Sequence, residues 1–371
     1  MFTENKTLIL FSAVIALLAT SLYTWYPTTT TIRLPNPANI SDIPNVVYLT
    51  EDMVDHIPGV MGGESLVKYK GDIVTGTLDG YLVGIDPDNL DIKWRIKCPL
   101  SESGGKCRIL GLRVVGDDLF GLDLYGRLFK FKSEEFKWLL DSNSPEISSL
   151  SPGFFNDLVL VRDMIYITDS FTFREDRKHL NMFQRFYSFE PDGKIIAYNM
   201  KSGEASVFAD NLITPNGIEL HRNGRSLLVA EGSMFRIRAV DLEGCSNVGV
   251  FSEGGTLGAV DNIRRGSKGF WVGVSTGRTT DSHISDLLTS YPLLRHLVTQ
   301  YRVFSPLLSY YSRTFTEEPR FYKVDEGGVV EKVVFGDKRF TETNAFSEVL
   351  EVGKYLFVGS PFSRSIFRVT L

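Results

Sequence analysis

Side chains with oxygen donor atoms recur at one place in a repeated pattern of this sequence. In three repeats a carboxylate or amide lies nine residues before a recurring apolar strand, and in a fourth repeat, which has a longer turn, it lies eleven residues before. These residues are Glu64, Asn156, Asn216 and Asp261, with Asn262 directly after Asp261. If the repeats are equivalent in space, the five side chains converge on one point.

Convergent carboxylates and amides are the chemistry of a hard divalent cation. Ca²⁺ binds six to eight oxygen ligands, and Glu64 and Asp261 would balance its two charges. Mg²⁺ prefers a tighter octahedron with several waters, and Zn²⁺ prefers His or Cys, neither of which aligns at this position. The sequence therefore predicts a calcium site. The alternative is that these are ordinary turn residues, and the other two repeats carry Leu110 and Ser347 at this position.

The repeat itself indicates how such residues would be positioned. Each copy has an apolar strand, a Gly or Asp turn and a further strand. The copies are 72–86, 118–131, 164–169 with 193–198, 226–231 with 236–240, 270–274 with 320–324, and 355–360 with 365–369. Six copies of about 55 residues predict an all-β, six-bladed β-propeller over 45–371. The chain ends within a strand pair, so we expect an early strand at 46–49 to close the ring with the last blade.

The N-terminus differs from the repeats. Residues 8–26 are uncharged, and as a helix they would span about 28 Å, close to the thickness of a bilayer's hydrocarbon core. We expect a cytosolic tail at 1–7, an N-terminal transmembrane signal-anchor helix at 8–26 and a stalk at 27–44. This makes a single-pass type II membrane protein with a lumenal or extracellular propeller, and the sequon at Asn39 is an expected glycosylation site. The alternative is a cleaved signal peptide and a secreted protein.

Two copies contain insertions, at 171–189 and 279–316. The longer one has a partly helical, amphipathic pattern, and two interpretations stay open: a lid or membrane-contacting helix over one mouth of the propeller, or a helix packed on the rim of a blade. The net charge of −5 and the lack of a Lys/Arg run argue against a nucleic-acid partner. Cys98 and Cys107 could form a disulfide in an oxidising compartment, which would leave Cys245 unpaired, or they could remain two free thiols.

Several motifs, in this order, resemble the strictosidine synthase-like family, whose wider relatives are the paraoxonases and gluconolactonases. The motifs are Phe154-Phe-Asn-Asp157, Ile165-Tyr-Ile-Thr-Asp-Ser170, Thr214-Pro-Asn-Gly-Ile218, Val229-Ala-Glu231, Val260-Asp-Asn-Ile263 and Phe270-Trp-Val-Gly273. The resemblance implies a six-bladed propeller containing calcium, with the same five residues as ligands, and in several members the hydrolysis of esters or lactones. It also implies the Cys98–Cys107 disulfide.

Some family features are absent from this chain. The second blade lacks the His pair of paraoxonases, and the five His residues are scattered. The catalytic Glu of strictosidine synthase has no clear counterpart, Asp325 being nearest, so a condensing activity is not expected. The leading hypothesis is a calcium-dependent hydrolase of small aryl esters or lactones, with Asp157 or Asp169 as candidate base, although a structural role suits both. The alternative is a binding or scaffold propeller with structural calcium.

Overall fold

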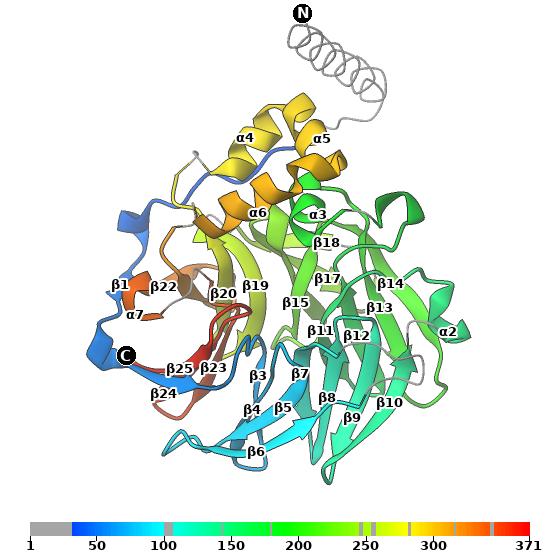
Figure 1. The fold of residues 1–371 in the computed structure, drawn as a ribbon, viewed down its shortest axis with the longest axis vertical. Helices are drawn as coiled ribbons and strands as arrows, with labels where there is room; N and C mark the ends of the chain where they lie inside the picture. Colours follow the sequence, from blue (N-terminus) through cyan, green and yellow to red (C-terminus); the bar gives the residue numbers. More distant parts are fainter. Residues whose placement is uncertain are drawn as a thin grey trace, which may run out of the picture.

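The computed structural model describes residues 32–99, 107–141, 144–178, 180–244, 248–253, 257–280, 283–314, 317–341 and 345–371. Six sheets radiate from a common axis as the blades of a propeller, and all their strand pairs are antiparallel except one at the outer edge of blade 5 (Figure 1). The predicted six-bladed β-propeller is therefore confirmed, and each of the six predicted copies supplies the two middle strands of one blade.

Within each blade the strands are ordered from the axis outward. Blades 1 to 3 are β3 (Leu66–Tyr69), β4 (Asp72–Gly76), β5 (Tyr81–Ile85) and β6 (Ile92–Lys97); β7 (Ile109–Val115), β8 (Asp118–Asp123), β9 (Arg127–Lys132) and β10 (Glu135–Asp141); and β11 (Phe155–Val161), β12 (Met164–Asp169), β13 (Gly193–Asn199) and β14 (Ala205–Leu212). Blades 4 to 6 are β15 (Pro215–Leu220), β16 (Ser226–Glu231), β17 (Arg236–Asp241) and β18 (Val248–Ser252); β19 (Gly258–Arg265), β20 (Phe270–Gly277), β21 (Arg320–Val324), β22 (Val330–Phe335) and β1 (Asn45–Tyr48); and β23 (Glu348–Val352), β24 (Tyr355–Gly359), β25 (Ser365–Thr370) and β2 (Val54–Pro58).

The strand that closes the ring differs from the prediction. Residues 45–48 form β1, which pairs in parallel with β22 on the outer edge of blade 5. The last blade is closed by the following strand, β2, which pairs antiparallel with β25. The prediction for 46–49 is wrong because β2 leads directly into blade 1 and so lies next to blade 6. The stacking of Tyr48 on Phe335, with ring centroids 5.1 Å apart, fixes β1 on blade 5.

The hydrophobic core lies between the blades rather than within one sheet. Six clusters of buried side chains fill the six interfaces between neighbouring blades. Strands near the axis are buried on both faces, as β4 is throughout, whereas outer strands such as β6 alternate between exposed and half-buried residues. Each blade therefore depends on both neighbours to bury its apolar surface.

Short helices gather at one end of the propeller. A helical cap, made of α3 (Met182–Ser188), α4 (Ile284–Ser290), α5 (Pro292–Gln300) and α6 (Ser305–Thr314), comes from the two predicted insertions (Figure 1). Both insertions follow the second strand of their blade, at the end where the innermost strands begin. The remaining short helices are α2 (Pro145–Ser148), α7 (Lys338–Thr341), η1 (Ile40–Asp42), η2 (Glu51–Met53), η3 (Glu175–Arg177), η4 (Gly232–Met234) and η6 (Arg302–Phe304).

The cap packs on the rim of the propeller through its own apolar cluster. This cap cluster has six buried members: Tyr187, Phe189, Met234, Leu288, Val298 and Leu308. The fully buried Gln184 of α3 donates to the carbonyl oxygens of Val298 and Tyr301, at 3.2 and 3.0 Å, and so joins α3 to the end of α5. The inner face of the cap therefore packs on η4 of blade 4 through Met234, and the choice between a lid and a rim helix stays open.

In the part of the chain that the structure describes, there is no helix of the length and apolar character needed to cross a bilayer. The predicted tail, the predicted membrane span 8–26 and Cys245 lie outside the described residues. Asn39 is exposed, and its side-chain oxygen accepts from the Ser41 hydroxyl at 2.8 Å. Glycosylation of Asn39 and membrane anchorage by 8–26 therefore stay predictions.

Candidate metal centre

The five predicted ligands lie at the start of the innermost strands, around the propeller axis. The innermost strands contact one another in a closed ring of six. In blades 2, 3 and 4 the first residue of the innermost strand pairs with the last residue of the second strand, as Phe155 does with Asp169. Leu110, Asn156 and Asn216 each come directly after that first residue, so the equivalence assumed from the sequence is correct, including the longer turn of blade 4.

A β-bulge near the start of the innermost strand interrupts the normal strand alternation in four blades, and in three of them it contains predicted ligands. In each of these bulges two residues of the innermost strand have no paired residue on the neighbouring strand: 110–111, 156–157, 216–217 and 261–262. Bulges bend a strand and redirect its side chains. In blade 5 the bulge contains both Asp261 and Asn262, which explains how one repeat contributes two adjacent ligands.

Each of the five side chains has one buried oxygen atom without a hydrogen-bond partner. These atoms are Glu64 Oε2, Asn156 Oδ1, Asn216 Oδ1, Asp261 Oδ1 and Asn262 Oδ1. An unpaired buried polar atom costs on the order of 1–3 kcal/mol, more when it is charged. Five such atoms, from two carboxylates and three amides, are the donor set that a hard cation such as Ca²⁺ satisfies. The residues present therefore fit the ion that the resemblance implies.

The electrostatics of the centre also favour a cation. Burial raises the pKa of Glu64 to about 7, against the opposing charge of Arg108. Burial also raises the pKa of Asp261 well above its usual value, and the charge of Glu64 raises it further. Two carboxyl groups are thus held close together at a site where, without a cation, each disfavours the charge of the other.

Hydrogen bonds join the ligand-bearing strands to one another. The backbone amide of Asn262 donates to the Ser347 carbonyl at 2.9 Å, and the Ser347 hydroxyl donates to the Glu64 carbonyl at 2.7 Å. Ser347, the non-ligand position of blade 6, therefore fastens blade 5 to blade 1. Gly217 packs so closely on blade 5 that an added Cβ would lie 2.5 Å from Asn262 Cα, so this position requires glycine.

A buried ion-pair network lies directly beside these ligands, and the sequence reasoning missed it. Arg264 donates to Asp157 at 2.8 Å and to the Ser65 hydroxyl at 3.1 Å, and it also forms an ion pair with Glu348. Ser65, Asp157 and Glu348 each directly follow an aligned ligand position. One guanidinium therefore links blade 5 to blades 1, 3 and 6.

Arg113 extends the network to blades 2 and 4. It forms an ion pair with Asp157 at 3.1 Å and donates to the Ile218 carbonyl at 2.6 Å. Arg113, Glu219 and Arg264 all lie three residues after an aligned ligand position. The signal that could have revealed the network was therefore this recurrence of charged residues in strands that are otherwise apolar.

The two candidate bases are both engaged by cations. Asp157 is fully buried, and despite burial its pKa is lowered by Arg113 and Arg264. Asp169 accepts from the amides of Gly153 and Phe154, at 3.0 and 2.7 Å, and lies 3.4 Å from Lys194 Nζ. Burial raises its pKa to about 6.

Asp169 occupies a position that recurs in two other blades. Asp123 and Glu231 also end the second strand of their blades, and each pairs with a basic residue at the start of the third strand. Each also accepts from a backbone amide that precedes the innermost strand. This repetition favours the structural role for Asp169, since three blades use the same arrangement.

The other residues considered for chemistry lie in structural positions. His283 is buried, caps α4 by accepting from the Ser285 amide at 3.1 Å, and has its pKa lowered to about 4 by burial. His179 lies outside the described residues. Asp325 lies in the turn after β21, at the end of the blade away from the cap, where it accepts from the Gly327 and Val329 amides.

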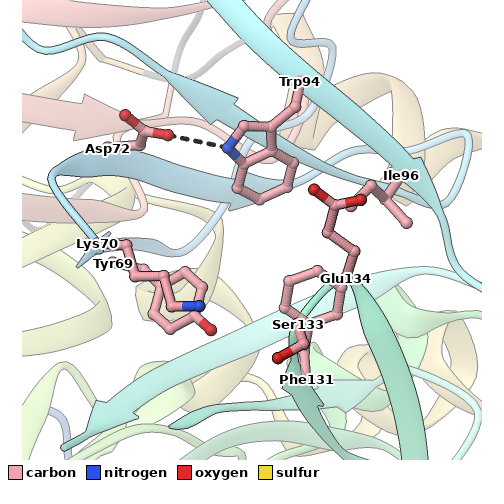
Figure 2. A pocket seen from close by; sticks show the side chains of 8 residues that line it. All are labelled: Tyr69, Lys70, Asp72, Trp94, Ile96, Phe131, Ser133 and Glu134. Atoms are coloured by element: carbon pink, nitrogen blue, oxygen red, sulfur yellow. Dashed lines mark hydrogen bonds between the residues drawn. The ribbon is translucent and has the colours of Figure 1, made fainter. Parts of the chain in front are cut away.

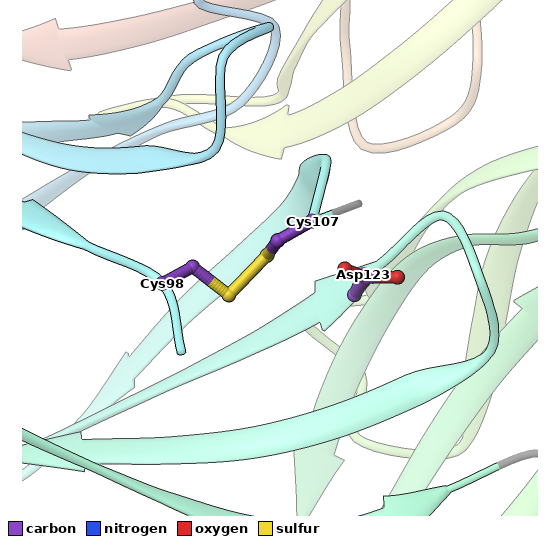
Figure 3. A group of neighbouring side chains, drawn as sticks. All are labelled: Cys98, Cys107 and Asp123. Atoms are coloured by element: carbon purple, nitrogen blue, oxygen red, sulfur yellow. A yellow bond between two sulfur atoms is a disulfide. The ribbon is translucent and has the colours of Figure 1, made fainter. Parts of the chain in front are cut away.

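Cys98 and Cys107 form a disulfide, as the family resemblance implied, with Cα atoms 6.3 Å apart (Figure 3). Asp123 lies beside it, and the three side chains together resemble a set of metal ligands. Because both sulfur atoms are in the S–S bond, they are not thiolate ligands.

A cavity of about 300 Å³ lies between blades 1 and 2 (Figure 2). Tyr69, Trp94 and Phe131 line it, and Trp94 Nε1 donates to Asp72 at 2.9 Å. The cavity borders the ends of β3 and β9, far along the strands from the candidate metal centre. It is therefore a feature separate from that centre.

Comparison with known proteins agrees with the motifs. The family model described as strictosidine synthase matches residues 157–241. The adipocyte plasma membrane-associated protein of Rattus norvegicus is 30% identical over 84% of this chain and 83% of its own length. The protein of the same name from Danio rerio is 35% identical over 66% of this chain, but the match spans only 61% of that relative.

Solved structures share the fold at low sequence identity. Regucalcin from Agrobacterium tumefaciens, described as a calcium-binding protein, aligns with a TM-score of 0.56 and 12% identity over 88% of this chain and 95% of its own. A gluconolactonase of Xanthomonas campestris aligns with a TM-score of 0.55 and 13% identity over 92% and 95%. On the sequence matches and the shared propeller together, the chain belongs to the strictosidine synthase-like family, with the adipocyte plasma membrane-associated proteins.

Proposed function

We propose that this protein is a membrane-anchored, calcium-binding propeller that hydrolyses small aryl esters or lactones. The observation that carries the proposal is the set of five buried oxygen atoms without partners at the axis. Glu64, Asn156, Asn216, Asp261 and Asn262 would hold the ion. When bound, Ca²⁺ would supply Lewis-acid polarisation of a substrate carbonyl. Structural neighbours described as gluconolactonases support the reaction class, and relatives named for membrane association support the anchor.

Calcium binding is tested first, on the purified full chain, by thermal unfolding with EDTA and with added Ca²⁺. A ligand present at 100 times its Kd stabilises a protein by about 2.7 kcal/mol, so a bound ion raises the melting temperature. Asp261→Asn keeps the shape of the side chain but removes one charge, and it should abolish most of this rise. Asn223→Ala, an exposed turn position in blade 4, is the control and should leave the rise intact. An equal response in wild type and Asp261→Asn would refute the site.

Hydrolysis is tested separately, with phenyl acetate and a simple lactone as probes. The proposal requires turnover that EDTA abolishes and Ca²⁺ restores. Absence of such turnover, together with intact calcium binding, would leave the site without a hydrolytic role.

A binding or scaffold propeller with structural calcium is the second candidate. It is favoured by one observation: Asp157 and Asp169, the candidate bases, are both held by cationic side chains. Asn216→Ala separates the two candidates. In a scaffold it lowers the melting temperature without any activity to lose, whereas in a hydrolase it lowers turnover as well.

A further inference from the structure

The outer face of the helical cap carries two stripes of exposed apolar side chains. Leu287, Tyr291 and Leu294 form one stripe along α4 and α5. Val303, Leu307 and Tyr310 form the other along η6 and α6, and their exposed fractions are 76, 58 and 60%. Leu307 and Tyr310 are three residues apart and lie on one side of α6, whereas the first stripe spans the junction between α4 and α5 at Tyr291.

The inner face of the same helices is already occupied. Leu288, Val298 and Leu308 are buried in the cap cluster. These helices are therefore apolar on two sides, although packing on the propeller requires only one apolar side. Several exposed apolar side chains on one group of helices are the kind of surface that marks an interaction site.

Charge and residue type indicate the chemistry of the partner. Residues 287–316 contain no Asp or Glu but three Arg, of which Arg295 is buried, in a chain whose net charge is −5; Asp286, earlier in α4, pairs with the buried Arg278. Arg302 is exposed between the two stripes. Tyr side chains among aliphatic ones, with basic and no acidic residues, are typical of helices that lie in the interface of a membrane containing anionic lipids.

The apolar N-terminal stretch of the sequence leads to the inner side of the same helical cap. Ile32 and Leu34 pack against the cap cluster. Only residues 27–31 separate Ile32 from the uncharged stretch 8–26, and the six steps from residue 26 to residue 32 reach about 22 Å at most. If 8–26 lies in a bilayer, the cap is held within that distance of its surface.

We infer that the outer face of α4, η6 and α6 docks on the surface of a phospholipid bilayer. The inference rests on the proposed anchorage by residues 8–26, and it adds a further contact that fixes the orientation of the propeller. Since the cap rises from the end of the blades where the innermost strands begin, docking turns that end toward the membrane.

The test uses the full chain in nanodiscs of phosphatidylcholine and phosphatidylserine, in a Cys245→Ser background. An environment-sensitive fluorophore is attached to either Val303→Cys or Val329→Cys. The two positions are a matched pair: both are exposed valines, but Val329 lies in the turn after β21, at the opposite end of the blade. Nitroxide-labelled lipids are then added in increasing proportion, and matching melting temperatures confirm that both variants fold.

The expected result is that nitroxide lipids quench the fluorophore at 303 and leave that at 329 unchanged. Co-elution with nanodiscs but equal signals at 303 and 329 would retain the anchor and overturn the docking. Failure to co-elute would refute the anchor and the docking together. Disulfide-linked dimers through Val303→Cys would show that another copy of the chain covers this face, which also overturns the inference.

Discussion

Arg264 offers a direct test of how the candidate metal centre is held together. Replacing it with Met keeps much of the side-chain volume but removes a guanidinium that lies 2.8 Å from Asp157 and forms an ion pair with Glu348. Asp157 would keep Arg113, at 3.1 Å. Glu348 would keep the Leu66 amide, at 2.7 Å, but no ion pair among the described residues.

The loss should be large because both carboxylates are fully buried. Removing one partner of a buried ion pair costs about 3–5 kcal/mol, chiefly because the other charge stays buried without compensation. For a large domain, about 2 °C per kcal/mol predicts a melting temperature roughly 6–10 °C lower. Calcium affinity should fall too, because Arg264 positions the strands that carry Glu64 and Asn156.

Two further variants separate this explanation from simple loss of packing. Arg264→Lys keeps the charge but not the planar fork that reaches several partners at once, so an intermediate loss is expected. Adding Glu348→Gln to Arg264→Met removes the uncompensated charge and should recover part of the stability. Urea unfolding measures all three. An Arg264→Met variant within about 1 kcal/mol of wild type would refute the reasoning, since a buried charge left without its partner costs well above that.

Three other changes have definite expected outcomes. The folded pKa of Asp169 is about 6 and its unfolded value is near 3.8, so the native state binds the proton more tightly and the free energy of unfolding falls as pH rises from about 4 to 6. Urea unfolding of the wild type across that range should show a decrease on the order of 3 kcal/mol from this group. Asp169→Asn, which cannot titrate, should not show that decrease. Gly217→Ala brings Cβ to 2.5 Å from Asn262 Cα, so it should lower the free energy of unfolding by about 1–3 kcal/mol and weaken calcium binding, as measured by calorimetry. Gly249→Ala, which has open space around it, is the control and should change neither quantity. Cys98→Ser opens a disulfide between residues 9 apart in sequence and should lower the free energy of unfolding by about 2–3 kcal/mol; a reductant that destabilises the variant as much as wild type would contradict this.

Much of the site could be predicted because a propeller repeats one local pattern six times. Aligning the strands was enough to select Glu64, Asn156, Asn216, Asp261 and Asn262, since equivalent positions in each blade face the same axis. The structure adds a feature that the alignment reflects: a two-residue bulge near the start of the innermost strand recurs in four blades.

The sequence by itself determined the number of blades, their middle strands and the equivalent positions at the start of the innermost strands, because strand periodicity and turn chemistry are local. Only the tertiary structure decided the contacts between segments far apart in the chain. It placed β2 rather than β1 in the last blade, joined Arg264 to residues of three other blades, and packed the insertion 279–316 on α3. These outcomes depend on which surfaces meet once the ring has closed. The candidate metal centre depends on both. The repeat selected its five residues, and the closed ring buries one oxygen atom of each without a hydrogen-bond partner.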